Sequence, residues 1–423
     1  MRAGVARAGI TPPIGAILVG FSDPERRATH VRDPLYATAL VLDDGQTRAA
    51  IISCDLIYVH PSVARSVGAL VWEQTGIAAG QVFICCSHTH SGPAACDHPG
   101  AQPIDRSYVA ILPFLLAGAV AEAAAQLEPV RLRWGTARSA VAVNRREMRA
   151  DGRIVLGHNP SGPVDPLVRV ACLDRLESDP PLALLVNYAC HPVTLGERSR
   201  VVSADYVGHT RTVVEHATGS CMLFLQGACG DINPRFGPGA DNGSVQTLGL
   251  DLAGAVLAAY AAASLLPTKR GLAAASRTVE LPLMEDTSII PDLISEDERR
   301  ELCRGIDQWE PWVGELSTDA EGRTVAPIDM QVLRVGDLAL VTVPAEPFVE
   351  IGLALQEARL GRPTMVAGYT NGCVGYTPMP AAYRLGGYEV ARSFVYPRLP
   401  APLAPSCAGR IISAGMQLRA ELD

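Results

Sequence analysis

Short apolar runs alternate with longer amphipathic or alanine- and leucine-rich segments along most of the chain. The runs "QVFICCS", "PLALLVNYACHP" and "CMLFLQGACGDINP" have the length and apolar content typical of buried strands. Residues 61–77, 106–127 and 244–264 predict helices. A further helix is expected in "SADYVGHTRTVVEHATG", with Ser203 as its N-cap and Gly219 just past its end.

Two β-hairpins frame this alternation. "PLYATALVLDDGQTRAAIISCDL" turns at Asp-Asp-Gly, and "IDMQVLRVGDLALVTVPAE" turns at Val-Gly-Asp. The more charged residues 283–325 predict a peripheral insertion with its own helix, and further helices are expected from about Phe348 and at the C-terminus. The pattern therefore predicts an α/β protein, with a mixed central β-sheet flanked by helices, in a single domain over residues 1–423.

The composition supports a globular protein and narrows its partners. Of 423 residues, 48% are hydrophobic and 19% are charged, which allows a substantial core. The net charge of −8 argues against nucleic acid as a partner. No run approaches 18 apolar residues and the N-terminus does not resemble a signal peptide, so we expect no transmembrane segment and a cytoplasmic location. The 11 cysteines show no CxxC pair and are expected to be reduced and buried.

Candidate metal ligands stand at the ends of apolar strands. His88 follows "FICCS", His191 follows "LLVNYAC", and Glu346 follows "LALVTVPA". Ligands gather at strand ends in α/β sheets, and two histidines with one carboxylate match a catalytic zinc site. Zinc lowers the pKa of bound water from about 15.7 to about 7, which makes hydroxide available at neutral pH.

Each of these signals has a plainer interpretation. In an extended strand, His88 and His90 point to the same side, so His90 either binds the metal, handles protons or only hydrogen-bonds the following turn. A histidine such as His191 is more often a core residue with its hydrogen bonds satisfied. Glu346 alone fits the first turn of a helix with Pro347 at N1.

The order and spacing of several motifs resemble the catalytic domain of the neutral/alkaline (non-lysosomal) ceramidase family. These motifs are "AGITPPIGAILVGFSD", "SHTHSGP", "NRR", "VNYACHP", "SADYVG", "LQGACGDINP", "VPAEP" and "NGCVGYTPMPAAYRLGGYE". The resemblance implies one catalytic Zn²⁺ held by His88, His191, Glu346 and Tyr376. Tyr376 would, from spacing alone, be taken for a loop tyrosine that packs under a turn.

The resemblance also implies roles around the metal. His90 would shuttle a proton, and Tyr388 would polarise the amide carbonyl. Arg145, or its neighbour Arg146, would steady the oxyanion, although Arg145 alone would be read as a surface ion-pair residue. Asn233 and the "GACGD" backbone would shape the substrate pocket.

The substrate-binding residues are therefore expected to be Gly230, Asp231 and Asn233. The plainer reading of this Gly-rich stretch is a tight turn that enters the next element.

Three departures from the family make ceramide a less suitable substrate. Asn233 stands where ceramidases carry serine, and neither a C-terminal immunoglobulin-like domain nor a secretion signal is expected here. The sequence therefore predicts a zinc-dependent hydrolase of a small or N-acyl amide. The alternatives are a true ceramidase with a lipid-like substrate and an inactive metal-stabilised binding protein. An α/β hydrolase is disfavoured because no G-x-S-x-G follows a strand, and the sequence allows a homo-oligomer.

Overall fold

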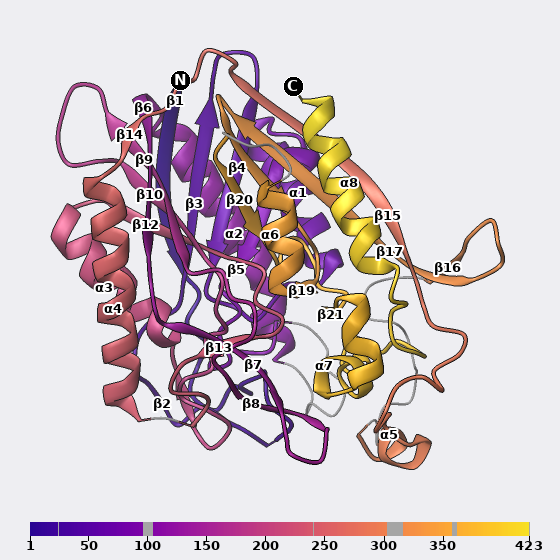
Figure 1. Ribbon diagram of the computed structural model, residues 1–423. Coiled ribbons are helices and arrows are strands. Elements are labelled where there is room, and N and C mark those ends of the chain that lie inside the picture. Colours follow the sequence, from indigo (N-terminus) through magenta and orange to yellow (C-terminus); the bar gives the residue numbers. More distant parts are fainter. Residues whose placement is uncertain (24, 96–104, 240, 303–315, 358–361, 423) are drawn as a thin grey trace.

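The strands form two large β-sheets that lie face to face, with helices on both outer faces (Figure 1). The computed structural model describes the chain except residues 24, 96–104, 240, 303–315, 358–361 and 423. The mixed α/β fold with a large mixed sheet is thus confirmed, and the second sheet adds a layer to the one that the sequence predicts.

The larger sheet has nine strands and is mixed. It consists of β1 (Arg2–Gly9), β3 (Tyr36–Asp43), β4 (Arg48–Cys54), β5 (Val82–Cys86), β6 (Glu128–Arg138), β9 (Leu167–Arg175), β10 (Ala183–Tyr188), β12 (Cys221–Gln226) and β14 (Ser264–Leu265). The order is β12-β10-β9-β6-β1-β3-β4-β5, with β14 beside β6. The pairs β4–β5 and β10–β12 are parallel, and the others are antiparallel.

The second sheet comes from the C-terminal part of the chain. It consists of β15 (Leu272–Pro282), β16 (Ser317–Thr318), β17 (Thr324–Val335), β18 (Leu338–Thr342) and β20 (Thr364–Ala367). Three small sheets carry loops between these elements: β2 (His30–Val31) with β11 (Val201–Val202), β7 (Ala142–Met148) with β8 (Ile154–Asn159) and β13 (Ile232–Pro234), and β19 (Glu346–Pro347) with β21 (Tyr376–Thr377). Both predicted hairpins are confirmed, as β3–β4 and β17–β18.

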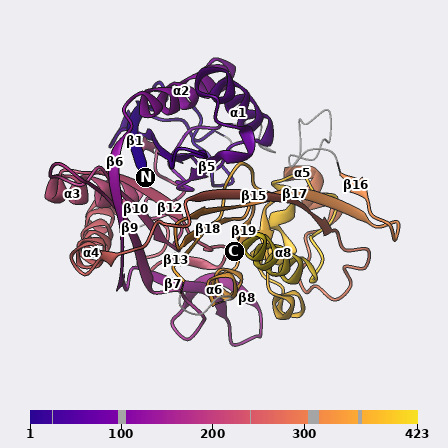
Figure 2. The ribbon, with the colours of Figure 1, turned by 90° about the horizontal axis from the view of Figure 1, so that it is seen from above.

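The longer helices cover the outer faces of the two sheets (Figure 2). The described residues form α1 (Pro61–Thr75), α2 (Arg106–Ala125), α3 (Asp205–Thr218), α4 (Asn242–Ala261), α5 (Glu296–Leu302), α6 (Val349–Glu357), α7 (Tyr388–Ala391) and α8 (Cys407–Glu421). The short helices α5 and α7 lie among the loops (Figure 1). Helix α2 packs on β1 and β3, α4 packs on β6 and β9, and α8 packs on β15 and β17. Helix α5 lies in the predicted insertion, of which residues 303–315 fall outside the described residues.

The alternation of side chains along each strand separates two cores. On β3, Ala39 and Val41 pack with the helices, whereas Leu40 and Leu42 pack between the two sheets with residues such as Leu340 of β18. Successive side chains of a strand point to opposite faces, so a strand buried on both sides reads as continuously apolar. The two sheets therefore share one core, although they come from different parts of the chain.

Helices α2 and α4 are long and apolar enough to cross a membrane by length and composition alone. In each, 44% of the apolar window is buried in the structure. Leu116 of α2 and Leu252 of α4 are fully buried in the core beneath the larger sheet. The core helices of soluble proteins pass the same test, so the expectation of no transmembrane segment stays a prediction.

Some local predictions need correction. Helix α3 begins at Asp205, so its N-cap position is Ala204 and not Ser203, although the Ser203 hydroxyl still accepts the backbone N–H of Asp205. Gly219 ends the helix with φ +67°, as predicted. Glu346 does not begin a helix, since it pairs with β21 and α6 starts three residues later.

The cysteines within the described residues agree with the prediction. Nine of them are reduced, and all but one are buried. Burial raises the pKa of Cys85 to about 12, so this thiol stays protonated at neutral pH.

Candidate metal centre

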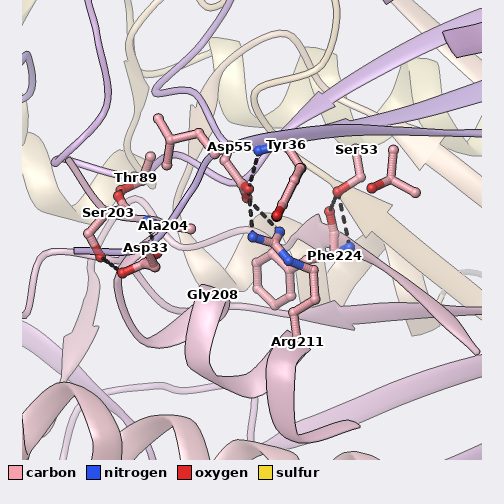
Figure 3. A network of polar contacts seen from close by, with 12 residues as sticks. Asp33, Tyr36, Ser53, Asp55, Thr89, Ser203, Ala204, Gly208, Arg211 and Phe224 are labelled. Atoms are coloured by element: carbon pink, nitrogen blue, oxygen red, sulfur yellow. Dashed lines mark hydrogen bonds and ion pairs between the residues drawn. The ribbon is translucent and has the colours of Figure 1, made fainter. Parts of the chain in front are cut away.

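Strands from opposite ends of the larger sheet meet beside the site. The Ser53 hydroxyl of β4 donates to the Phe224 carbonyl of β12 at 2.8 Å, and the Phe224 amide donates back at 3.0 Å (Figure 3). This closure brings the ends of β5 and β12 together, although seven positions separate these strands in the sheet order. The loops that follow β5, β10 and β12 therefore converge on one place.

His88 and His90 meet through a turn rather than along a strand. Strand β5 ends at Cys86, and His88 has a left-handed φ of +66°. The two rings are nevertheless close, with centroids 4.8 Å apart. The expectation of an extended H-x-H is thus wrong, although its consequence, two rings at one site, is met.

Thr89 fixes this turn through a buried polar network. Its hydroxyl donates to the Ser203 carbonyl at 2.7 Å, and the Ser203 hydroxyl donates to Asp33 at 2.5 Å (Figure 3). Asp33 also accepts the Ala204 amide at 2.7 Å. The entry to α3 thereby holds the segment that carries both histidines.

Two imidazole rings lie close to a single carboxylate oxygen. The Nε2 atoms of His88 and His191 lie 3.4 and 3.5 Å from Oε2 of Glu346. Nδ1 of His88 lies 2.8 Å from the Ile57 carbonyl, and Nδ1 of His191 lies 2.7 Å from the Cys229 carbonyl. A carbonyl only accepts hydrogen bonds, so the Nδ1 atom of each ring carries the proton. In the neutral ring the Nε2 atom then has a free lone pair.

These atoms fit a cation. Nε2 of His88 and Oε2 of Glu346 are buried without a hydrogen-bond partner, and lone pairs facing a carboxylate repel one another. Burial and the Arg145 guanidinium lower the pKa of His191 to about 4, so its ring is neutral at pH 7. Burial on its own raises the pKa of Glu346, and a positive charge between the carboxylate and the two Nε2 atoms, from a proton or a cation, lowers it. Neutral imidazoles and an ionised carboxylate are the forms that bind a metal.

His90 belongs to the same cluster but is held differently. Ligand atoms of His88, His90 and His191 all lie within 4.8 Å of one another. Neither ring nitrogen of His90 has a hydrogen-bond partner, and its ring packs edge-on against Phe21 at a centroid distance of 5.1 Å. Burial and the two neighbouring histidines lower the pKa of His90 below its ordinary value.

Glu346 and Tyr376 are placed side by side by the pairing of two short strands. They are direct partners across the parallel pair β19–β21. Burial raises the pKa of the Tyr376 phenol, and its ring centroid lies 5.3 Å from Cζ of Arg145. Sequence spacing gives no sign of this pair, because thirty residues and a helix separate its members.

Arg145 and Arg146 share one buried carboxylate that the sequence analysis missed. Arg145 Nε donates to Oε1 of Glu389 at 2.8 Å, and Arg146 Nη1 donates to Oε2 at 2.5 Å. A β-bulge between Asn144 and Arg146 allows consecutive side chains to reach the same partner. Arg145 is 5% exposed and lines the cavity described below, so it is the pocket arginine and not a surface residue.

Glu389→Gln removes the anion between two buried guanidinium groups. Breaking a buried ion pair from one side costs about 3–5 kcal/mol, because the charge that remains is uncompensated. We expect the free energy of unfolding, measured in denaturant, to fall by about this amount. Glu421→Gln is the matched control, because Glu421 pairs with Arg277 at the surface, where such pairs contribute about 0–1 kcal/mol. Equal losses in the two variants would contradict the assignment.

A cavity of about 190 Å³ opens above these residues. Seven of the ten predicted site residues line it: His88, His90, Arg145, Asn233, Glu346, Tyr376 and Tyr388. His191 lies beside Glu346, with its Nε2 atom 3.5 Å from Oε2. The Tyr388 ring packs edge-on against Tyr376 at 5.7 Å, so the two phenols form one wall with Arg145.

The Gly-rich loop contributes one residue to the wall and two to its support. Asn233 lines the cavity and accepts from Arg145 Nη1 at 3.3 Å. Asp231 faces away, since its carboxylate accepts the Val349 amide and the Asn144 side chain. A Cβ at Gly230 would lie 2.6 Å from the Glu346 carbonyl. Asp231 and Gly230 therefore position β19 and Arg145 rather than line the cavity.

The N-terminal part of the chain is similar to known ceramidases. The model of the neutral/alkaline non-lysosomal ceramidase N-terminal region matches residues 1–247. The neutral ceramidase of Pseudomonas aeruginosa is 22% identical over 251 residues, which are 55% of this chain and 37% of that protein. This chain thus matches well under half the length of that curated relative.

Solved structures show the same fold over the whole chain. The crystal structure of neutral ceramidase from Pseudomonas aeruginosa has a TM-score of 0.77 at 18% identity, over 100% of this chain and 74% of that one. A ceramidase complexed with C2 has a TM-score of 0.78 at 18% identity, over 100% of this chain and 75% of that one. At such identities the structures establish the architecture, and the chemistry has to be argued from the site.

Proposed function

Because the chain belongs to the neutral/alkaline non-lysosomal ceramidase family, we propose that it is a zinc-dependent amidohydrolase that cleaves the C–N bond of an amide. One observation carries this proposal: the unprotonated Nε2 atoms of His88 and His191 converge on a buried oxygen of Glu346. Nitrogen and carboxylate donors at this spacing suit zinc.

His88, His191 and Glu346 would hold the metal, with Tyr376 as a fourth ligand beside Glu346. When bound, zinc supplies a Lewis acid and lowers the pKa of water to about 7. The backbone carbonyls behind both histidines keep their rings oriented for this task.

Of the remaining side chains, one would transfer protons and two would stabilise negative charge. His90 is neutral and has both ring nitrogens free of hydrogen bonds, so it can accept a proton from water and pass it to the leaving amine. Arg145 and Tyr388 line the same cavity and would donate to the carbonyl oxygen as negative charge develops on it. One such donor contributes about 2.7–4 kcal/mol in other enzymes.

The size of the cavity favours a small or N-acyl amide. Its volume of about 190 Å³ lies below the range of about 300–1,000 Å³ that ligand pockets commonly span. A two-chain lipid such as ceramide exceeds this space. Ceramide hydrolysis is the second candidate, because the relatives that share the fold are ceramidases.

Metal analysis and a substrate panel test the proposal together. We expect about one zinc per chain by mass spectrometry, and hydrolysis of short N-acyl amino acids that stops with chelator and returns with zinc. Ceramide belongs in the same panel and should be cleaved more slowly. Full activity in a metal-free sample would overturn the proposal, and zinc binding without cleavage of any amide would favour a metal-stabilised binding protein.

A further inference from the structure

We propose that Phe21 and Tyr396, joined through Ser22, determine substrate specificity by limiting the length of the group attached to the scissile amide. The inference rests on the proposed function and goes beyond it, because it assigns substrate selection to residues that take no part in metal binding. All three residues line the cavity.

The segment that carries Phe21 lies directly against the proton-transfer histidine. Gly20 has a φ of +104°, and a Cβ there would lie 2.4 Å from Nδ1 of His90. The backbone therefore approaches the imidazole more closely than any other residue type would allow. The Phe21 ring then meets the His90 ring edge-on, with centroids 5.1 Å apart.

A buried guanidinium holds this segment in place. Arg26 is fully buried, and its Nη1 donates to the Val19 carbonyl at 3.1 Å and to the His90 carbonyl at 2.7 Å. Its Nε donates to the Ser199 carbonyl at 2.8 Å, and its Cζ lies 4.9 Å from the Phe21 ring centroid. Arg26 thus anchors the backbone that precedes Phe21 and packs on the Phe21 ring, which supports the ring in the cavity wall.

A hydrogen bond joins this wall to the C-terminal part of the chain. The hydroxyl groups of Ser22 and Tyr396 lie 3.1 Å apart, and the Tyr396 ring packs against Tyr388 at 6.3 Å. Tyr388 stands beside Arg145, where the carbonyl of the substrate would bind. The exposed Ser22–Tyr396 contact therefore joins the Phe21 part of the cavity wall to the part formed by Tyr388 and Arg145.

The consequence is an upper limit on the substrate. Each methylene buried in an apolar cavity raises affinity about fourfold, at about 0.8 kcal/mol per CH₂. This gain ends where the chain meets the wall of Phe21 and Tyr396, because this wall is tied from both sides.

Straight-chain hydroxamates of two to ten carbons test the limit by binding alone. We expect their affinity for the zinc-loaded protein, measured by calorimetry, to rise with length and then stop. Phe21→Ala should move that stop by about two carbons, so that the first excluded length gains about 15-fold at about fourfold per methylene. Tyr396→Phe removes the Ser22 bond and keeps the ring, so it should produce a smaller shift in the same direction.

The control is Phe236→Ala, which removes an exposed phenyl ring outside the cavity lining. It should leave the length limit of the wild type unchanged. The proposal is overturned if Phe21→Ala and Tyr396→Phe, with zinc bound and folded by circular dichroism, keep the wild-type limit. It is also overturned if Phe236→Ala moves the limit equally. A protein that shows the length limit but cleaves no amide would refute the proposed function, and Phe21 and Tyr396 would then limit the length of a bound ligand rather than of a substrate.

Discussion

His88→Ala should lose both its zinc and its amide hydrolysis. The variant removes one of two nitrogen donors from a site where the other donor, His191, is anchored separately on the Cys229 carbonyl. Loss of an outer partner of a metal ligand already weakens binding about 10–100-fold, so loss of the ligand itself should exceed 100-fold. Zinc content after dialysis and hydrolysis of the substrate found in the panel measure the two effects.

The matched control is His216→Ala, which removes an exposed histidine from the last turn of α3. It should keep its zinc and its turnover, since no part of the site depends on that side chain. Full zinc occupancy in His88→Ala would remove His88 from the ligand set. Partly retained zinc with lost activity would instead indicate that the other donors hold the metal weakly and in an unproductive geometry.

Much of the fold could be read from the sequence because its signals are local. The β3–β4 hairpin is predicted by a turn dipeptide between two apolar runs, and Gly219 by its position after an amphipathic segment. The second sheet could not be read in this way. Its strands have the same apolar pattern as those of the first sheet. Their placement in a second sheet depends on long-range packing, such as that of Leu40 and Leu340 in the core between the sheets.

The site shows the same division between local and long-range information. Strand ends identify His88, His191 and Glu346 as candidates, since ligands gather at such ends. Glu389 could not be found from spacing, because its importance comes from two arginines more than 240 residues away. The close approach of the strands at Ser53 and Phe224, which makes the candidates converge, likewise leaves no mark in the sequence.

Whether His90 is a metal ligand or a proton carrier depends on the hydrogen-bond partner of its second ring nitrogen. Metal-binding histidines almost always donate their second N–H to a carbonyl, carboxylate or water, as His88 and His191 do here. His90 has no such acceptor, and its ring rests against Phe21 instead. This difference between His90 and the other two histidines supports our proposal that His90 carries protons, a role that the sequence left open.

His90→Ala should accordingly keep its zinc and lose turnover by about 10²–10⁴-fold, the usual contribution of a general acid–base group. The loss should fall on kcat more than on KM, because proton transfer belongs to the chemical step. Zinc content distinguishes the result from that of His88→Ala. Loss of the metal in His90→Ala would make His90 a ligand, in keeping with the 4.8 Å cluster of three histidines. Unchanged turnover would remove it from the reaction, and the proton would then have to travel through another group that lines the cavity.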